Sequence, residues 1–184
     1  MQIDKITAGK LPDELNVIIE IPMNDDPVKY EVDKESGAIF VDRFMQCAMF
    51  YPCNYGFIPH TLSGDGDPVD VLVLSNYPVI SGAVVKCRPI GVLMMEDESG
   101  VDEKIIAVPV SKVDVSFNNI QDINDISDIV KNRIKHFFEH YKDLDKDKWV
   151  KVLGWENIKV AKELIEEGAR RSSNSVSKKL TLKF

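Results

Sequence analysis

The amino-acid sequence predicts an α+β fold that is mainly β, in which strands occupy the first two-thirds of the chain and helices follow. Up to about residue 124, short apolar runs alternate with clusters of Gly, Pro, Asn and Asp, which is typical of strands joined by turns. Beyond that point the apolar residues recur every three or four positions, as in amphipathic helices. Many short strands in succession indicate a sandwich or a barrel. The sequence contains no internal repeat and no linker, so we expect residues 1–184 to form a single domain.

Six segments have the composition of strands, because β-branched residues are enriched in them and turn-forming residues bound them. The short connection Glu35-Ser36-Gly37 predicts a hairpin between the second and the third. Another turn that joins two strands is expected at Ser99-Gly100, within the acidic cluster 96–104. The six expected strands are 16–21, 28–33, 38–43, 69–74, 84–95 and 104–110.

Two helices are expected near the end of the chain. The helical spacing of apolar residues beyond Asn124 predicts a helix through about residue 142. A short strand at 149–153 and a second helix from about 157 to 167 follow, and Gly168 is the natural stop for that helix.

The last stretch, 169–184, differs from the rest of the chain. It is polar and turn-prone at first, then basic with apolar residues at alternate positions. We expect a frayed terminus, with a strand that docks on a neighbouring subunit as the alternative.

Composition limits the class of protein. The chain has 184 residues, of which 44% are hydrophobic and 29% charged, as in an ordinary globular protein. No apolar run is long enough to span a bilayer, and the N-terminus lacks the pattern of a secretory signal. The three cysteines form no CxxC pair, which suits reduced thiols, and Cys53 is expected to be buried and inert rather than reactive. We therefore expect a cytoplasmic protein with no membrane partner.

Net charge narrows the range of partners further. The formal net charge of -7 argues against a nucleic-acid binder, because affinity for the phosphate backbone depends on clustered Lys and Arg. An acidic enzyme can still act on a phosphorylated substrate if cations serve as intermediaries.

The string Asp65-Gly66-Asp67-Pro68-Val69-Asp70 is the strongest candidate for a functional site. Three carboxylates within six residues repel one another, and Asp70 lies in a β-branched run where an unpaired carboxylate is costly. The pattern favours a site for a hard metal ion over the alternative of a solvated acidic turn. It does not fit a Ca²⁺ loop of the EF-hand type, because Val69, Asp70 and Asn76 occupy positions 5, 6 and 12.

Other charged residues alternate with the apolar residues of the expected strands. Lys29 and Glu31 share one face of a strand, as do Asp102 and Lys104, and Glu20 lies within an apolar run. Each of these residues alone fits a solvated surface. Two acidic loops together with isolated cations, however, can supply both metal ligands and phosphate donors. The cations concerned are Lys29, Arg43, Lys104 and Lys142.

Tyrosine and histidine patterns are less specific. Tyr51, Tyr55 and Tyr141 are either core residues with a bonded hydroxyl or ligand contacts, and their spacing does not decide between the two. His136 and His140 have a spacing that can hold Zn²⁺ or Ni²⁺, but Glu139 does not fit the HExxH arrangement. We expect this helix face to meet another subunit.

These motifs together resemble those of a known family. The string Asp65-to-Val71 matches the D-G-D-P-x-D-V motif of the soluble inorganic pyrophosphatases of the first family, bacterial type. The likeness extends from about Lys10 to Glu163, and several further blocks follow in the same order. These blocks are 26–31, 42–45, 49–56 and 136–142.

The resemblance implies a five-stranded OB-like closed barrel with two helices packed outside it. It also implies Mg²⁺-dependent hydrolysis of inorganic pyrophosphate to two orthophosphates by direct attack of a metal-bridging water, without a covalent intermediate. Several Mg²⁺ ions per active site are implied, with Mn²⁺ or Zn²⁺ as possible substitutes and Ca²⁺ as an inhibitor. Bacterial members are typically homohexamers. The ending after Gly168 departs from the Ala/Lys-rich helical ending of the family.

The resemblance also implies a role for each site residue. Asp67 is implied as the general base. The metal ligands are implied to be Asp65, Asp70 and Asp102 for the tighter pair of ions, with Asp97 and Glu20 for the additional ions. Phosphate oxygens are implied to contact Lys29, Arg43, Tyr55, Lys104, Tyr141 and Lys142, with Glu31 and Tyr51 in support. Two rival classes make different predictions: a nucleic-acid-binding barrel predicts salt-sensitive binding of single strands, and a Ca²⁺-binding structural domain predicts stabilisation without turnover.

Overall fold

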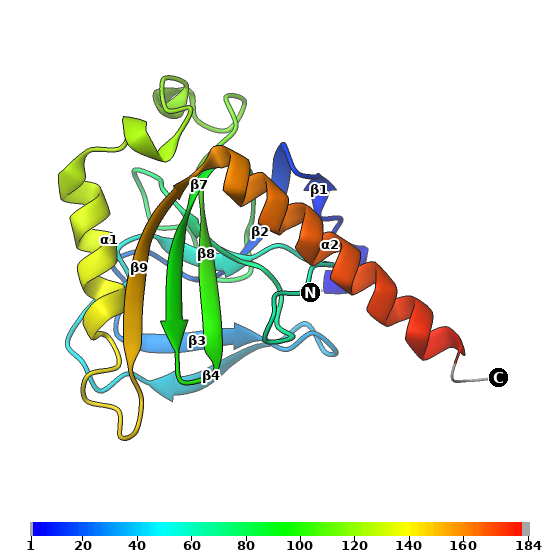
Figure 1. The fold of residues 1–184 in the computed structure, drawn as a ribbon, viewed down its shortest axis with the longest axis horizontal. Coiled ribbons are helices and arrows are strands. Elements are labelled where there is room, and N and C mark those ends of the chain that lie inside the picture. The colour runs from blue at the N-terminus through cyan, green and yellow to red at the C-terminus, as the bar shows by residue number, and fades with distance from the viewer. Residues whose placement is uncertain (1, 182–184) are drawn as a thin grey trace.

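The structure is a computed structural model that describes the backbone of residues 2–181 and the side chains of residues 2–175 (Figure 1). Strands dominate the first part of the chain, and both α-helices lie in the last third, as predicted. The strands are β1 (Gly9–Lys10), β2 (Glu14–Ile21), β3 (Val28–Val32), β4 (Ile39–Phe44), β5 (Asn54–Phe57), β6 (Asp70–Val73), β7 (Val84–Asp97), β8 (Gly100–Pro109) and β9 (Val150–Asn157). The α-helices are α1 (Asp128–His140) and α2 (Ile158–Thr181), and short 3-10 helices occur at Ile3–Lys5, Val115–Phe117 and Ile123–Asp125.

Five strands close into a barrel. The hydrogen-bonded order β2-β5-β6-β8-β7 is completed by a further pairing of β7 with β2, so the ring has no open edge. The β6–β8 pair is parallel and the other pairs are antiparallel. The predicted five-stranded closed barrel is therefore confirmed.

Successive residues of the barrel strands belong to two apolar clusters, because side chains alternate between the two faces of a strand. Leu72 and Ile106 pack in a cluster with Phe137 of α1. Val71 and Ile105, one residue earlier on the same strands, pack in a second cluster together with residues of α2. The two helices thus cover different parts of the barrel surface, α1 beside β9 and α2 across β7 (Figure 1).

Strand β5 was not among the predicted strands, although it joins β2 to β6 in the barrel. Its sequence, Asn54-Tyr55-Gly56-Phe57, contains two residues that are typical of turns. Gly56 is needed for another reason: a Cβ atom there would lie 2.0 Å from the carbonyl oxygen of Ile18 on β2. The glycine therefore allows two strands to approach closely and does not mark a turn.

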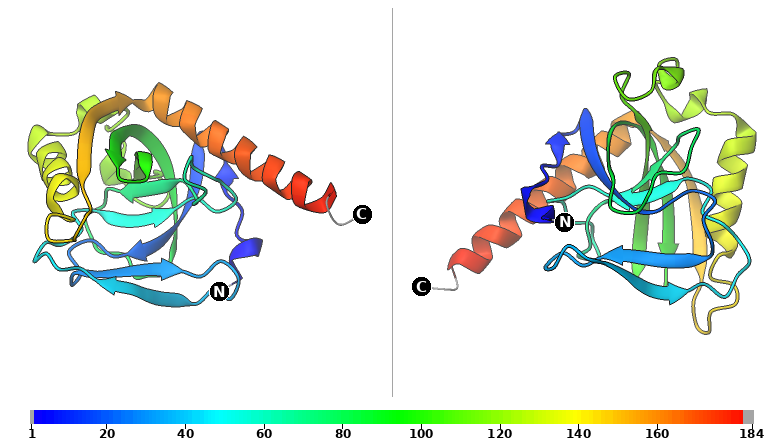
Figure 2. Two further views of the ribbon diagram at one scale, coloured as in Figure 1. Left: turned by 60° about the horizontal axis from the view of Figure 1, so that its bottom comes forward. Right: turned by 180° about the vertical axis from the view of Figure 1, so that it is seen from behind.

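The prediction that Gly168 ends the second helix is wrong. Helix α2 continues to Thr181. Over residues 169–181, the prediction of a frayed terminus and the alternative of a docking strand are therefore both wrong. Residues 182–184 lie outside the described part of the chain. A Cβ atom at Gly168 would lie 2.5 Å from Cγ2 of Val69, so the glycine allows close packing. The far end of α2 points away from the barrel (Figures 1 and 2).

Strands β3 and β4 form a separate two-stranded hairpin beside the barrel (Figure 2). The hairpin turn predicted at Glu35-Ser36-Gly37 is confirmed, and Asp33 stabilises it by accepting a hydrogen bond from the Ser36 amide at 2.7 Å. The register of the two strands places Lys29 directly opposite Arg43. The turn predicted at Ser99-Gly100 likewise joins β7 and β8. No helix in the described part of the chain is long and apolar enough to cross a membrane.

Candidate active site

A cavity of about 380 Å³ opens between the β3–β4 hairpin, the loop before β6 and the β7–β8 hairpin. Its walls contain every residue for which the sequence predicted a role in catalysis, metal binding or substrate binding. These residues are Glu20, Lys29, Glu31, Arg43, Tyr51, Tyr55, Asp65, Asp67, Asp70, Asp97, Asp102, Lys104, Tyr141 and Lys142. The structure thus brings together residues from β2, β3, β4, β5, β6, β7 and β8, from the loops before β5 and β6, and from the turn after α1.

Lys104 lies at the base of this cavity between two carboxylates. The parallel register of β6 and β8 pairs Asp70 with Lys104, and Asp102 lies two residues earlier on the same face of β8. The Nζ atom of Lys104 donates hydrogen bonds of 2.5 Å to both Asp70 and Asp102, and its side chain is only 6% exposed. Burial alone would lower the pKa of Lys104, but the two carboxylates outweigh burial and raise the pKa above its ordinary value. Burial raises the pKa of Asp70, and the ammonium of Lys104 opposes that rise.

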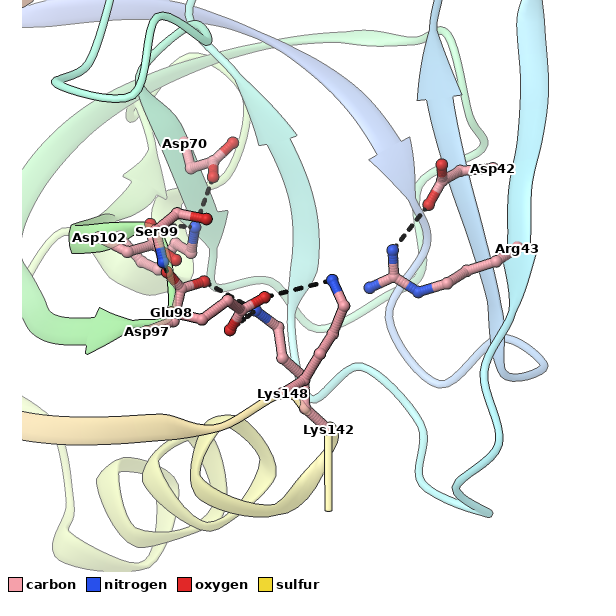
Figure 3. Close-up of polar contacts among 10 residues, drawn as sticks. Asp42, Arg43, Asp70, Asp97, Glu98, Ser99, Asp102, Lys142 and Lys148 are labelled. Atoms are coloured by element: carbon pink, nitrogen blue, oxygen red, sulfur yellow. Dashed lines mark hydrogen bonds and ion pairs between the residues drawn. The ribbon is translucent and has the colours of Figure 1, made fainter. Parts of the chain in front are cut away.

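Lys142 makes a similar contact at the tip of the β7–β8 hairpin (Figure 3). It lies in the turn after α1 and donates a 2.7 Å hydrogen bond to Asp97, while Glu98 lies 3.5 Å away. Burial would raise the pKa of Asp97, but hydrogen bonds from Lys142 and from the Ser99 amide outweigh burial and lower it. Lys148 contacts the other side of Glu98 at 3.2 Å.

The β3–β4 hairpin carries its own set of charges. Asp42 accepts a 2.9 Å hydrogen bond from Arg43 (Figure 3). Asp42 also lies 3.5 Å from Lys29, which in turn contacts Glu31. Asp42 therefore links the two predicted phosphate-binding cations of this hairpin. Its role was not predicted, although it lies within one of the blocks that carry the family resemblance.

The loop that carries Asp65 and Asp67 is fixed at its base and exposed at its tip. Thr61 accepts a hydrogen bond from the amide of Val69 at 3.0 Å, which closes the base. At the tip the amide of Asp67 donates to Asp65 at 2.9 Å, and the side chain of Asp67 is 74% exposed. Lys34, which follows β3, contacts Asp67 at 2.9 Å and so connects this loop to the hairpin.

Glu20 is the most buried carboxylate of the predicted set, at 8% exposure. Its Oε1 atom accepts a hydrogen bond of 2.8 Å from the amide of Val32. Burial raises the pKa of Glu20 to about 7, and the nearby carboxylates of Asp70 and Glu31 add to the rise. Glu20 therefore changes its charge near neutral pH in the metal-free protein.

The three tyrosines, for which the sequence left open a place in the core or in a binding site, both pack against other rings and line the cavity. Tyr51 packs against Tyr55 and Phe137, with ring centroids 5.4 and 4.7 Å apart, and all three tyrosines also line the cavity. Burial raises the pKa of Tyr51, Tyr55 and Tyr141, so their hydroxyls stay protonated and can donate hydrogen bonds. The Nζ atom of Lys104 lies 5.9 Å from the centroid of the Tyr55 ring.

Several charged residues near the cavity escaped the sequence prediction. Lys34, Glu98 and Lys148 line it, and Asp42 contacts two residues of the lining, Lys29 and Arg43. Lys34 and Lys148 lie in loops, where no alternation of residues could indicate which way a side chain points. Their place beside the cavity is evident only from the ion pairs of Lys34 with Asp67 and of Lys148 with Glu98.

The predicted cysteine and histidine features lie outside the cavity lining. Cys47, Cys53 and Cys87 are free and buried, which confirms the predicted burial of Cys53. Burial raises the pKa of the Cys53 thiol to about 12, in agreement with the prediction that this thiol is inert. The rings of His136 and His140 lie 4.6 Å apart on an exposed face, and His140 contacts Asp143 at 2.8 Å. The expectation that this face meets another subunit stays a prediction.

The carboxylates that line the cavity are of the type found in sites for hard metal ions, but they are not grouped around one ion position. Carboxylate oxygens are the ligands preferred by Mg²⁺, and seven predicted carboxylates line this one cavity. Among the described residues, no three His, Cys, Asp or Glu side chains stand ready to hold a metal ion. Lys104 lies between two of the predicted ligands, Asp70 and Asp102. The residues present therefore fit a hard cation in chemical type.

The closed barrel and its cavity define a class of barrel protein in which carboxylate, lysine, arginine and tyrosine side chains line one cavity. Comparisons with known proteins identify the family. The family model described as inorganic pyrophosphatase matches residues 17–173. The chain belongs to this family, in its bacterial type, and the predictions of the family and of the enzyme class are confirmed.

Individual relatives agree with this assignment. The inorganic pyrophosphatase of Rickettsia bellii is 69% identical over 171 residues, which cover 93% of this chain and 98% of the relative. That of Escherichia coli is 59% identical over 175 residues, covering 95% and 99%. The solved structure of an inorganic phosphatase from Anaplasma phagocytophilum matches with a TM-score of 0.90 and 51% identity, over 92% of this chain and 99% of the other. The inorganic pyrophosphatase of Thermus thermophilus matches with a TM-score of 0.89 and 45% identity, over 94% and 99%.

Proposed function

We propose that this protein hydrolyses inorganic pyrophosphate to two orthophosphates, with Mg²⁺ as the cofactor and by direct attack of water on phosphorus. The observation that carries this proposal is that the residues implied by the family motifs all border one cavity. Both cationic and carboxylate side chains line that cavity, which suits a highly charged anion accompanied by metal ions. No covalent intermediate is needed.

The carboxylates divide into two groups. Asp65, Asp70 and Asp102 are proposed to hold the tighter pair of Mg²⁺ ions, and Asp97 and Glu20 the ions that arrive with substrate. When bound, Mg²⁺ supplies Lewis acidity, which lowers the pKa of water and offsets the negative charge of pyrophosphate.

Asp67 is proposed as the general base. Its side chain lines the cavity and is 74% exposed, so the carboxylate is accessible to solvent. Its loop is fixed at the base by the hydrogen bond between Thr61 and Val69, so its position is well defined. Proton transfer to a carboxylate held in this way is worth about 10²–10⁴ in rate.

The remaining residues bind the two phosphoryl groups. Charge that develops on the leaving phosphate is stabilised by fixed donors that need no reorganisation. The tyrosine hydroxyls can donate because burial keeps them protonated. The proposed donors are Lys29, Arg43, Tyr55, Lys104, Tyr141 and Lys142, with Glu31 and Tyr51 in support.

Further features of the proposal follow from the family. We propose a single domain over residues 1–184, a cytoplasmic location, a homohexamer, and no nucleic-acid partner. Mn²⁺ or Zn²⁺ would replace Mg²⁺ in part, while Ca²⁺ would inhibit. The paired histidines His136 and His140 lie on an exposed face that suits a subunit contact.

One assay tests the reaction and both rival classes. Phosphate release from pyrophosphate is measured with Mg²⁺, with EDTA, and with Ca²⁺ in place of Mg²⁺. We expect release with Mg²⁺ only. A protein that releases no phosphate with Mg²⁺ but is stabilised by Ca²⁺ would be the structural Ca²⁺-binding domain instead, and one that only binds single strands would be the nucleic-acid module.

A further inference from the structure

Lys104 occupies a position that the proposed reaction does not explain. Its ammonium group donates 2.5 Å hydrogen bonds to Asp70 and to Asp102 at once, and it is almost fully buried. In the proposed reaction, these two carboxylates hold metal ions and Lys104 holds a phosphate oxygen. The contacts in the structure therefore differ from those that turnover requires.

The geometry is imposed by the barrel. The parallel pairing of β6 with β8 sets Asp70 beside Lys104, and alternation along β8 puts Asp102 on the same face. Two partly buried carboxylates that contact the same ammonium would repel each other if no cation lay between them. The ammonium of Lys104 supplies that charge within the protein itself.

A divalent ion cannot join Asp70 and Asp102 while this ammonium stays in place. Both cations would compete for the same carboxylate oxygens, and they repel each other at such short range. Lysine has a flexible four-carbon stem, so its charged end can move while its backbone stays in the sheet. Once displaced, a buried ammonium needs another anion.

We infer that Lys104 is a built-in counter-cation, which holds Asp70 and Asp102 in the metal-free protein, is displaced when a divalent ion binds, and then becomes available to the substrate phosphate. This inference rests on the proposed function, because it takes Asp70 and Asp102 as metal ligands. It adds that metal binding and pyrophosphate binding are coupled through one side chain. By reciprocity, each ligand then raises the affinity for the other.

A second lysine, Lys142, also forms an ion pair with a proposed metal ligand. It is buried and contacts Asp97, a proposed ligand of the additional ions. Lys29, by contrast, lines the same cavity but contacts Glu31 and Asp42, which are not proposed ligands. Lys29 therefore provides a matched control for the loss of one positive charge.

The test measures Mg²⁺ affinity by isothermal titration calorimetry on protein freed of metal with EDTA and then dialysed, without pyrophosphate. The variants are Lys104→Met, Lys104→Arg and Lys29→Met. We expect Lys104→Met to bind Mg²⁺ at least tenfold more tightly than the wild type, because no ammonium has to be displaced. Lys104→Arg, which keeps the charge, should bind no more tightly than the wild type, and Lys29→Met should change the affinity less than threefold.

Stability provides a second measurement. Without metal, Lys104→Met should melt at a lower temperature than the wild type, because its two partly buried carboxylates lack a cationic partner. Mg²⁺ should raise the melting temperature of the variant more than that of the wild type. If Lys104→Met does not fold in EDTA, Lys104→Gln replaces it in both measurements, since its amide still donates hydrogen bonds but carries no charge. For Lys104→Gln we expect the same directions of change in Mg²⁺ affinity and in melting temperature.

Two results would overturn the inference. One is an unchanged or weaker Mg²⁺ affinity in the uncharged Lys104 variants, and the other is an equal gain in Lys29→Met, which would indicate a general effect of charge. Failure of the proposed function is recognised separately. If the wild type releases no phosphate from pyrophosphate with Mg²⁺, the reaction itself is wrong, whatever the titrations show.

Discussion

Replacing Glu20 by Gln tests whether this buried carboxyl group makes stability depend on pH. Burial raises the pKa of Glu20 from its ordinary value of 4.5 to about 7. The folded protein therefore binds this proton more tightly than the unfolded chain does. The stability that the protonated group contributes is fully present below pH 4.5 and is lost as the pH rises through 7.

The magnitude follows from the pKa values. One pKa unit corresponds to about 1.4 kcal/mol, so the rise at Glu20 corresponds to about 3 kcal/mol of stability lost by the metal-free protein between acidic and alkaline pH. The amide introduced by Glu20→Gln cannot titrate, but its oxygen can still accept the hydrogen bond from the Val32 amide. We therefore expect Glu20→Gln to gain stability relative to the wild type as the pH rises.

The assay is urea unfolding in EDTA at pH 5 and pH 8. The difference in unfolding free energy between Glu20→Gln and the wild type should increase by about 2–3 kcal/mol between these two pH values. Glu14→Gln on the same strand serves as the control, because its partly exposed contact with Lys86 at 3.9 Å is expected to contribute less than about 1 kcal/mol. An equal difference at pH 5 and pH 8 for Glu20→Gln would refute the reasoning.

Other predictions concern the base, a metal ligand and the packing of α2. Asp67→Asn should lower kcat about 10²–10⁴-fold without abolishing Mg²⁺ binding, and turnover at the wild-type rate would exclude Asp67 as the base. Asp70→Ala should require more Mg²⁺ for half-maximal activity, whereas an unchanged Mg²⁺ titration would count against its role as a ligand. Gly168→Ala should destabilise the protein by about 1–3 kcal/mol in urea unfolding, because the new methyl group meets Val69, while Gly64→Ala, in open space, serves as its control; equal losses would contradict this.

The strands and the first helix were predictable because their signals are local. Alternation and helical spacing depend on neighbouring residues, and turn residues such as Glu35-Ser36-Gly37 act within a few positions. Strand β5 escaped prediction because Gly56 is needed for its approach to β2, a contact between segments distant in the sequence. Gly168 misled the prediction for the same reason, since its role is to pack against Val69.

The residues of the candidate site were predicted through motifs, but the ion pairs between them were not. The resemblance to the family supplied the residue types and their implied roles, and the structure gathers those residues around one cavity. The contacts of Lys34 with Asp67 and of Lys148 with Glu98 follow no spacing rule, because the partners lie on separate loops.

The sequence by itself determined the class of fold, the family and the chemical types of the groups in the site, because these depend on local patterns and on ordered motifs. Only the tertiary structure decided which charged side chains form ion pairs with each other. Lys104 and Asp70 are 34 positions apart in the chain, yet the parallel register of β6 and β8 makes them direct partners. Glu20 is buried where the Val32 amide of β3 reaches it, and Lys104 is shared by two carboxylates because β6 pairs with β8. Both arrangements join segments that are distant in the sequence, so local sequence patterns contain no signal for them.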